Sequence, residues 1–382
     1  MKILIPLHNF ITWNGGVDLI RLIVTALRSV ADEQPLQLVF AMPEAWPGET
    51  REATQLRAMT HEFTQGWPVL DCGDDGRSIS RLAVEVGATI VFPSMQPIRG
   101  SHVRKVGYIY DFQHRDLPGN FSAAERAQRD EQFAAIAANS DAIFTTSRFV
   151  AEAVQRHLGV PAQRVLTLPF TPYAQPSWFA TASADAQTRH ATGERYAMIC
   201  NHFWIHKDHA TALRAFAQVV QRPEHSDLNL VMTGATSDFR DPAHFEGIVA
   251  LIRSLGIESR CRILGLIPKG DQIALLRAAR VLIQPTRYEG GPGGGSSYEA
   301  IGLGLPAVLS DIPVNHEARA DGVDYFRVGD VGDLADTLLR VLALPRHEPA
   351  IDALLEQSQA RLRHAGRSLL AGLQGLMLPR VA

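Results

Sequence analysis

Short apolar runs alternate with longer amphipathic segments along most of the chain. In the first half the apolar runs are too short for helices and end at polar residues, glycine or proline, which favours buried strands. The predicted strands are residues 3–6, 36–41, 88–92, 106–110, 141–145 and 164–168. Residues 17–30, 122–139 and 147–158 instead carry apolar residues at helical spacing. Ser122 and Glu125 form a capping-box pattern at the start of the second helix.

This alternation stops at residues 169–195 and then resumes. Three prolines, Pro169, Pro172 and Pro176, precede a polar, alanine-rich stretch without apolar periodicity, which indicates a connection between domains. Beyond it, the predicted strands are residues 196–200, 228–232, 260–264, 280–284, 307–310 and 324–328. The predicted helices are residues 211–220, 242–255, 271–278, 296–302 and 331–342. A last helix with a leucine stripe is expected from residue 351 onward.

The repeated strand–helix order predicts an α/β fold with mostly parallel sheets covered on both faces. We expect an N-terminal Rossmann-like domain at residues 1–172, a linker at 173–195, and a second Rossmann-like domain at 196–350. A C-terminal helical segment at 351–382 would pack back on the first domain. Two such domains would face each other across a cleft, and ligands in these sheets bind beyond the carboxyl ends of the strands.

Composition excludes several classes of protein. The chain has 382 residues, 46% of them hydrophobic and 20% charged, and a net charge of −3, which gives no support for nucleic-acid binding. Its three cysteines are far apart and form no CxxC pair, so neither a disulfide framework nor a zinc knuckle is expected. Pro6, His8 and Asn9 interrupt the first apolar run, which argues against a signal peptide. We expect a cytoplasmic protein, with peripheral association at the inner face of the membrane left open.

The strongest chemical signal is the segment PTRYEGGPGGGSSYE at residues 285–299, between a predicted strand and a predicted helix. Its glycines permit unusual backbone angles and close approach of a ligand. They are Gly290, Gly291, Gly293, Gly294 and Gly295. Ser296 and Ser297 then open a helix whose free N–H groups can hold a diphosphate. The acids Glu289 and Glu299 flank the turn and suit sugar and ribose hydroxyls, whereas the simpler alternative is a flexible surface loop.

A second segment, CNHFWIHKDH at residues 200–209, follows the first strand of the second domain. Lys207 precedes a helix that Asp208 is expected to cap, and a lysine there can neutralise a leaving diphosphate as a compact point charge. Asn201 and His202 are further candidates for binding the phosphates. The alternative is that the aromatic residues of this loop only pack and that Lys207 is merely exposed.

Two weaker signals lie in the first domain. Asp111 and His114 follow a predicted strand in YDFQHRDLPGNFS, although histidines at such places are as often structural as functional. Gly15 and Gly16 start the first helix and could let backbone amides approach a phosphate or an acceptor oxygen. The full G-x-G-x-x-G pattern is missing there, which disfavours NAD binding.

The segment from Glu289 to residue 309 resembles the donor-binding signature of retaining GT-B glycosyltransferases, the glycosyl transferases group 1 that include glycogen synthases and bacterial mannosyltransferases. The resemblance extends over nearly the whole chain in order and spacing. It implies that Glu289 binds hydroxyls of the donor sugar and that Glu299 binds the ribose. This chain departs from the family in two ways: nine residues rather than seven separate the acids, and His202 takes the place of an arginine. Either His202 donates to the phosphates, or Asn201 and the amides of the glycine turn do so.

The resemblance extends to three other segments. His114 lies in a D-x-Q-H pattern of one subgroup, where it would contact the transferring sugar or position the acceptor. Gly15 and Gly16 would lie near the diphosphate and the acceptor, and the main chain of Ile267 would contact the nucleobase. No D-x-D pattern is present, since the aspartates near residue 73 have the wrong spacing, and no metal or other cofactor is expected.

These observations predict a retaining, metal-independent hexosyltransferase. It would transfer a sugar from a UDP- or GDP-sugar to a glycan or lipid-linked glycan acceptor, in the synthesis of a bacterial surface polysaccharide. Lys207, Glu289, His114 and Asp111 are the expected catalytic residues. A GT-B nucleotide-sugar epimerase, a sugar phosphorylase and a non-catalytic nucleotide-sugar-binding subunit remain as alternatives.

Overall fold

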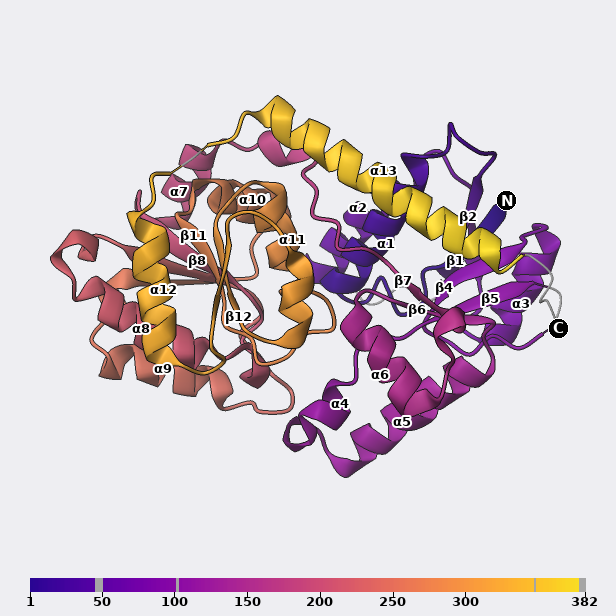
Figure 1. Ribbon diagram of the computed structural model, residues 1–382, viewed down its shortest axis with the longest axis horizontal. Coiled ribbons are helices and arrows are strands. Elements are labelled where there is room, and N and C mark those ends of the chain that lie inside the picture. Colours follow the sequence, from indigo (N-terminus) through magenta and orange to yellow (C-terminus); the bar gives the residue numbers. More distant parts are fainter. Residues whose placement is uncertain (45–50, 101–102, 347, 378–382) are drawn as a thin grey trace. The chain divides into compact units, whose positions relative to one another are not determined.

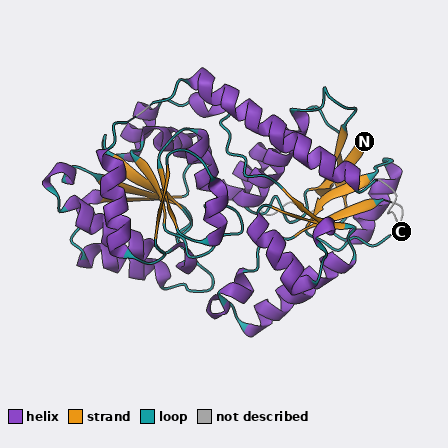
Figure 2. Ribbon diagram, viewed as in Figure 1, coloured by secondary structure: helices purple, strands orange, loops and turns teal. Residues whose placement is uncertain are grey.

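The computed structural model describes residues 1–44, 51–100, 103–346 and 348–377, and the chain folds into two compact units. The first unit contains residues 1–171 and the chain from Ala360 onward, and the second contains Pro172–Gln359. In each unit the strands lie side by side with helices on both sides of the sheet, as Figure 2 shows. Both are Rossmann-like domains built on parallel sheets, as the sequence predicts.

The first unit has a seven-stranded sheet in the order β3-β2-β1-β4-β5-β6-β7. Its strands are β1 (Lys2–Pro6), β2 (Gln37–Pro43), β3 (Val69–Cys72), β4 (Ile90–Ser94), β5 (Arg104–Tyr108), β6 (Ala142–Thr145) and β7 (Val165–Thr167). Its main helices are α1 (Asn14–Arg28), α2 (Arg51–Thr64), α3 (Gly76–Glu85), the short α4 (Gln113–Asp116), α5 (Ala123–Ala138) and α6 (Arg148–Leu158). The helix α3 packs on β1, β2 and β4, and the helices α5 and α6 pack on β6.

The second unit has a six-stranded sheet in the order β10-β9-β8-β11-β12-β13. Its strands are β8 (Tyr196–Cys200), β9 (Asn229–Thr233), β10 (Cys261–Gly265), β11 (Val281–Gln284), β12 (Ala307–Ser310) and β13 (Val323–Phe326). Its main helices are α7 (Ser183–His190), α8 (His209–Val220), α9 (His244–Ser254), α10 (Lys269–Ala278), α11 (Gly294–Gly302) and α12 (Val331–Ala343). One core joins α8, α9 and α12 to the sheet, while α10 and α11 lie on its other side (Figure 1).

Every strand and main helix predicted from the apolar pattern is present, with ends shifted by up to three residues. The capping box is confirmed, because the Ser122 hydroxyl accepts from the Glu125 N–H and the Glu125 carboxylate accepts from the Ser122 N–H. The pattern did not predict β3, α2 or α3. Three of the four residues of β3 are exposed at the edge of the sheet, so this strand has no apolar run to recognise.

Residues 173–195, expected to form a linker, contain a helix that the pattern does not predict. This helix, α7, packs on α10, where Asp271 accepts from Arg189 and from the His190 ring at 2.9 Å. The Arg277 guanidinium on α10 also donates to the Thr181 carbonyl at 3.0 Å. The helix is short and polar, so its partners on α10, rather than an apolar stripe, give it a place in the second unit.

The last helix, α13, spans Ile351–Gly375, and the final residues of the expected segment, 378–382, lie outside the described residues. From Ala360 on it belongs to the first unit. Gly366 lies so close to the Ala26 carbonyl of α1 that a side chain there would collide with it. Arg367 also donates to both carboxylate oxygens of Glu33, at 2.7 and 3.0 Å.

In both sheets the strand order reverses once, between β1 and β4 and between β8 and β11. The connections from two neighbouring strands leave in opposite directions at such a point and open a crevice beyond their carboxyl ends. In the second unit, the loops that follow β8 and β11 are the two segments in which the sequence placed most of the chemistry.

Candidate functional site

Lys207 and Glu289 meet beyond the carboxyl ends of β8 and β11, which pair in parallel. The Lys207 ammonium nitrogen lies 2.5 Å from Glu289 Oε1, and each side chain is only 11% exposed. Lys207 ends a short 3-10 turn, and Asp208 caps α8 through the Thr211 N–H, as predicted. The structure therefore brings together the lysine and the first acid from two segments that the sequence could only treat separately.

The glycine turn places the beginning of α11 beside this ion pair. Gly293 and Gly294 have φ values of +61° and +66°, in the left-handed region that favours glycine. A Cβ at Gly294 would lie 3.2 Å from Glu289 Oε1, and a Cβ at Gly293 would collide with the Ser297 hydroxyl. No side chain caps the helix, and Gly295 in its first turn is exposed with open space around it. The first turn of α11 is thus suited to bind an anion with its backbone N–H groups.

Ser296 and Ser297 lie inside the first turn, because α11 begins two residues earlier than predicted. Both side chains are buried. Ser297 Oγ donates to the Gly293 carbonyl at 2.8 Å, and Ser296 Oγ accepts from Gln284 Nε2 at 3.4 Å. These hydroxyls hold the turn in shape, and the N–H groups of the helix remain the groups that could bind a ligand.

A buried network of amides and hydroxyls, which the sequence analysis missed, supports the turn. The Gln284 side chain donates to the Gly293 carbonyl and accepts from the Asn201 amide. Asn315 Oδ1 accepts from the Gly293 N–H at 2.6 Å, and Asn315 Nδ2 donates to the Ser310 carbonyl at 2.8 Å. Gln284, Ser310 and Asn315 are fully buried. Polar residues at the ends of the apolar strands β11 and β12 were the available signal, since buried amides and hydroxyls are nearly always bonded.

His202 is held as a neutral imidazole. Its Nδ1 accepts from the Ala235 N–H at 2.9 Å, so the proton of the neutral ring lies on Nε2. Burial, and then the nearby Lys207 charge, lower the pKa of His202 to about 4. The amide of Asn201, the other residue predicted to bind the phosphates in this loop, is engaged with Gln284.

Glu299 lies on α11, is buried, and is bonded through both carboxylate oxygens to α10. Lys269 Nζ contacts one oxygen, and Gln272 Nε2 donates to the other at 2.9 Å. Burial and the nearby Glu299 charge raise the pKa of the Cys200 thiol, at the end of β8, to about 12. Ile267 is half-buried two residues before Lys269, in the loop after β10. The second acid and the predicted nucleobase segment therefore lie on connected elements, and Lys269 and Gln272 join the candidate site.

The remaining predicted residues lie in the first unit, around β1 and β5. Gly15 packs against the Trp13 ring, and Gly16 lies against the Phe10 carbonyl, so close packing requires both glycines. Asp111 accepts from Arg129 Nη2 at 2.5 Å.

The His114 side chain is fully buried in an aromatic setting made by Phe112, Phe121 and Phe133. Its Nε2 lies 2.8 Å from Asp130 Oδ1. Burial is the main cause of the lowered pKa of His114. In this structure His114 is positioned by its neighbours and its side chain has no exposed surface.

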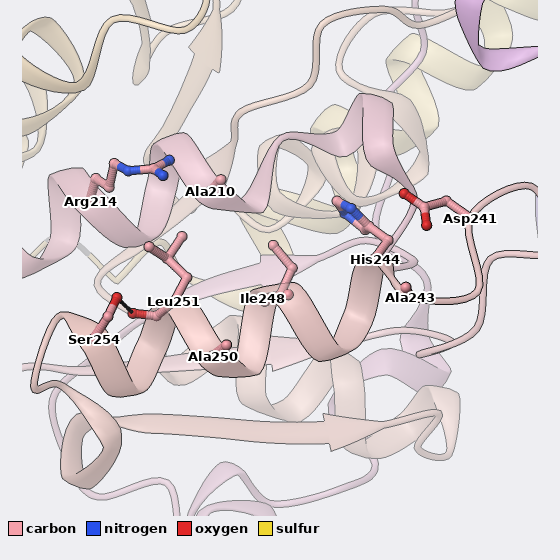
Figure 3. A pocket seen from close by; sticks show the side chains of 10 residues that line it. Ala210, Arg214, Asp241, Ala243, His244, Ile248, Ala250, Leu251 and Ser254 are labelled. Carbon is pink, nitrogen blue, oxygen red and sulfur yellow. Dashed lines mark hydrogen bonds between the residues drawn. The ribbon is translucent and has the colours of Figure 1, made fainter.

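A separate hollow of about 540 Å³ lies between α8 and α9 in the second unit. Figure 3 shows Arg214 and Ala210 of α8 on one side, and Ile248, Leu251 and His244 of α9 on the other. None of the residues predicted for the donor site lines this hollow, so it is distinct from the Lys207–Glu289 pair.

Two further findings concern metals and membranes. Within the described ranges, no group of three or more histidine, cysteine, aspartate or glutamate side chains is arranged to hold a metal ion. Among the helices of those same ranges, none is both long and apolar enough to cross a membrane.

Two Rossmann-like domains with parallel sheets are the arrangement of the GT-B class of folds. The second domain carries the acid–glycine–acid segment at the point where its strand order reverses. Residues 181–364 match the family model described as Glycosyl transferases group 1. The matched residues include Lys207, Glu289, Glu299 and the glycine turn. No curated protein sequence matches the chain.

Solved structures of similar fold cover nearly the whole chain. HepE of Anabaena in complex with UDP and glucose has a TM-score of 0.61 and 14% identity, covering 99% of this chain and 98% of that chain. Sucrose-phosphate synthase of Thermosynechococcus elongatus has a TM-score of 0.63 and 16% identity, covering 98% and 97%. WaaG, a glycosyltransferase involved in lipopolysaccharide biosynthesis, has a TM-score of 0.58 and 15% identity, covering 100% of both chains. At these identities the similarity establishes the fold.

Proposed function

We propose that this protein transfers a sugar from a nucleoside-diphosphate sugar to a hydroxyl acceptor, with retention at the anomeric carbon. The observation that carries the proposal is the Lys207–Glu289 ion pair beside the uncapped first turn of α11. A cation and a set of N–H groups converge there with a carboxylate, and a sugar diphosphate offers both an anionic group and hydroxyls. The group 1 glycosyl transferase domain over the same residues supports this reading.

In the proposed reaction, the bond between the anomeric carbon and the β-phosphate oxygen breaks, and its electron pair goes to the phosphate. The acceptor oxygen forms the new bond to the anomeric carbon on the same face, and its proton passes to the leaving phosphate. Lys207 and the N–H groups of residues 295 and 296 stabilise the charge that develops on that phosphate. Glu289 releases Lys207 to the phosphate and accepts hydrogen bonds from sugar hydroxyls.

Uridine diphosphate is the proposed nucleotide, because the structurally similar HepE is known in complexes with UDP and UDP-glucose. In this chain, Glu299 would accept from the ribose hydroxyls, and the main chain of Ile267 would contact the base. His202 would donate from Nε2 to a phosphate oxygen. No metal ion is required in this scheme, since Lys207 and the helix terminus supply the positive charge.

The acceptor is proposed to be a glycan or a lipid-linked glycan, recognised by the first unit. Gly15, Gly16 and Asp111 lie after β1 and β5, where ligands of such sheets bind. His114 would act by positioning this segment, because its side chain is buried. WaaG, which has this fold, is involved in lipopolysaccharide biosynthesis, and this supports a role in bacterial surface polysaccharide synthesis. The proposed location is the cytoplasm.

The decisive experiment is incubation of the purified protein with labelled UDP-, GDP-, ADP- and dTDP-sugars, with and without candidate acceptors and inorganic phosphate. We expect acceptor-dependent release of one nucleoside diphosphate, and loss of that release in Lys207→Ala and Glu289→Ala. Release without an acceptor would indicate an epimerase, and dependence on phosphate would indicate a phosphorylase. Undiminished turnover in both variants would show that the site is assigned wrongly.

A further inference from the structure

The turns that carry Lys207 and Glu289 are joined by contacts in addition to the ion pair itself. The backbone N–H of Arg287 donates to the His206 carbonyl at 2.8 Å, and the side-chain Nε of Arg287 donates to Asp208 Oδ2 at 2.9 Å. His206 and Asp208 are the residues directly before and after Lys207, and Arg287 lies two residues before Glu289. The loop after β8 is thus fastened to the loop after β11 on both sides of the lysine.

Asp208 has a backbone conformation that its capping role does not require. It caps α8 through Thr211, whose N–H and hydroxyl lie 3.4 and 2.9 Å from its carboxylate. Its φ and ψ of +48° and +44° lie in the left-handed region, which residues other than glycine adopt rarely and aspartate and asparagine only occasionally. The other side-chain N-caps of the described helices have φ between −63° and −154°. They are Asp75, Ser122, Ser147 and Asp330.

Capping of α8 alone therefore does not account for the left-handed conformation of Asp208. Lys207 comes directly before this turn, so the conformation of Asp208 sets the direction in which the chain carrying Lys207 leaves the β8 loop. The Asp208 side chain is nearly inaccessible, with 4% exposed, whereas that of Arg287 is 54% exposed. Burial of the carboxylate beside a guanidinium strengthens their attraction and keeps this turn in one geometry.

We propose that Asp208 and Arg287 are positioning residues that hold the Lys207 ammonium and the Glu289 carboxylate in register at the carboxyl edge of the sheet. This inference rests on the proposed function of the Lys207–Glu289 site. Lys207 must meet the leaving phosphate while Glu289 holds the sugar, and a shift of about 1 Å in such a geometry can lower a rate about 100-fold. Loosening the Asp208–Arg287 contact should therefore slow turnover more than it weakens donor binding.

Three variants test the contact. Asp208→Asn keeps an oxygen for capping and a residue type that tolerates the left-handed region, but removes the charge. Arg287→Gln removes the guanidinium from a half-exposed side chain. We expect each to lower kcat about tenfold while the donor KM rises by no more than about threefold. The double variant should lose no more than the worse single variant, because both substitutions remove one contact.

A matched control is Arg340→Gln, which removes an arginine from another ion pair of the second unit. Arg340 lies 3.1 Å from Asp324 and joins α12 to the edge strand β13. This variant should keep the wild-type kcat. The melting temperatures of these four variants and the wild type, measured in parallel, report any loss of stability separately from the loss of rate.

The proposal is overturned if folded Asp208→Asn and Arg287→Gln proteins turn over donor at the wild-type kcat, or if their effects on kcat add in the double variant. A fall in melting temperature with unchanged kcat also overturns it, since a purely structural role predicts that result. Absence of turnover in the wild type would instead contradict the proposed function. The affinity for UDP, measured by calorimetry, then tests the Asp208–Arg287 contact alone. Each single variant should bind UDP about threefold more weakly, and the two effects should not add in the double variant. Unchanged affinity would overturn the proposal.

Discussion

The ammonium of Lys207 lies 2.5 Å from the carboxylate of Glu289, although the two residues are 82 positions apart along the chain. They meet because β8 and β11 are neighbours at the point where the strand order of the sheet reverses. The Glu289 carboxylate holds the lysine beside the first turn of α11. In the proposed reaction, a phosphate group of the donor would replace this carboxylate as the partner of the ammonium. The following predictions depend on this geometry and on the buried groups around it.

Removal of the Lys207 charge should act mainly on the chemical step. We expect Lys207→Ala to lower kcat by about 100-fold or more, in the range found when one preorganised stabilising group is removed from an active site. Initial rates of nucleoside diphosphate release over a range of donor concentrations measure kcat and KM separately. Lys105→Ala, which removes a lysine that contacts the Gly100 carbonyl in the first unit, is the control and should keep normal rates.

The neighbouring glycines Gly294 and Gly295 should respond differently to alanine. Gly294 has φ of +66° and lies against Glu289, so Gly294→Ala should lower the free energy of unfolding by about 1 kcal/mol or more and impair donor binding. Gly295 has open space around its Cα, so Gly295→Ala should fold with normal stability. Its methyl group should nevertheless raise the donor KM by obstructing the first turn of α11. Thermal unfolding and donor kinetics distinguish the two, and equal stability of both variants would contradict the turn geometry.

Glu299 should account for recognition of the ribose. If its carboxylate accepts from a ribose hydroxyl, wild-type protein should bind UDP about tenfold more tightly than 2′-deoxy-UDP or 3′-deoxy-UDP, as expected for a hydrogen bond to a charged group. Glu299→Gln should lose most of that difference, because the substitution and the missing hydroxyl remove one interaction. Calorimetric titration with the three nucleotides measures this. A preference that survives the substitution unchanged would assign ribose recognition to other groups.

Acid should destabilise the second unit through His209. This side chain is fully buried, stacks on Phe203 with ring centroids 4.3 Å apart, and has no hydrogen-bond partner at either ring nitrogen. Burial, followed by the nearby His244 and Lys207, lowers the pKa of His209 to about 3. His209 therefore becomes protonated near pH 6.5 in the unfolded chain, but only near pH 3 in the folded chain.

The stability contributed by neutral His209 is thus fully present above about pH 6.5 and is lost as the pH falls, by about 1.4 kcal/mol per pH unit. His209→Phe keeps the ring, removes the titrating group, and should flatten the dependence of melting temperature on pH between about 4.5 and 6.5. His202, whose pKa is lowered to about 4, contributes a slope of the same sign that should persist in this variant. An unchanged slope in His209→Phe would contradict the prediction.

Turnover should not require a divalent cation, because Lys207 and the first turn of α11 supply the positive charge in the proposed scheme. We expect the rate of donor turnover to be the same in excess EDTA as in added Mg²⁺ or Mn²⁺. Loss of turnover in EDTA with recovery on addition of one of these ions would require a metal-dependent mechanism instead.

Much of the fold is readable from periodicity. The apolar runs predicted β8 at residues 196–200 and β12 at residues 307–310 with the bounds that the structure shows, since these strands are buried on both faces. The edge strand β3 and the polar helix α7 were missed. Neither has an apolar face wide enough to produce a pattern, and both are held by neighbours that lie elsewhere in the sequence.

The candidate site divides in the same way. The glycine segment, both acids and Lys207 could be selected from the sequence because residue type and position after a strand are local properties. The hydrogen bonds of Gln284 and Asn315 with Gly293 could not be predicted from the sequence. Each residue looks like an ordinary polar position as long as the location of its partner in the fold is unknown. The side-chain burial of His114 was equally hidden, since the rings around it come from three separate elements.

By itself, then, the sequence determined which segments become strands and helices and which residue types stand at the strand ends, since backbone propensity and apolar spacing act over a few neighbouring residues. Only the tertiary structure decided that Lys207 pairs with Glu289, that Glu299 pairs with Lys269, and that Arg287 reaches Asp208. These pairings depend on strand order, and strand order is set by how whole elements pack together in the core.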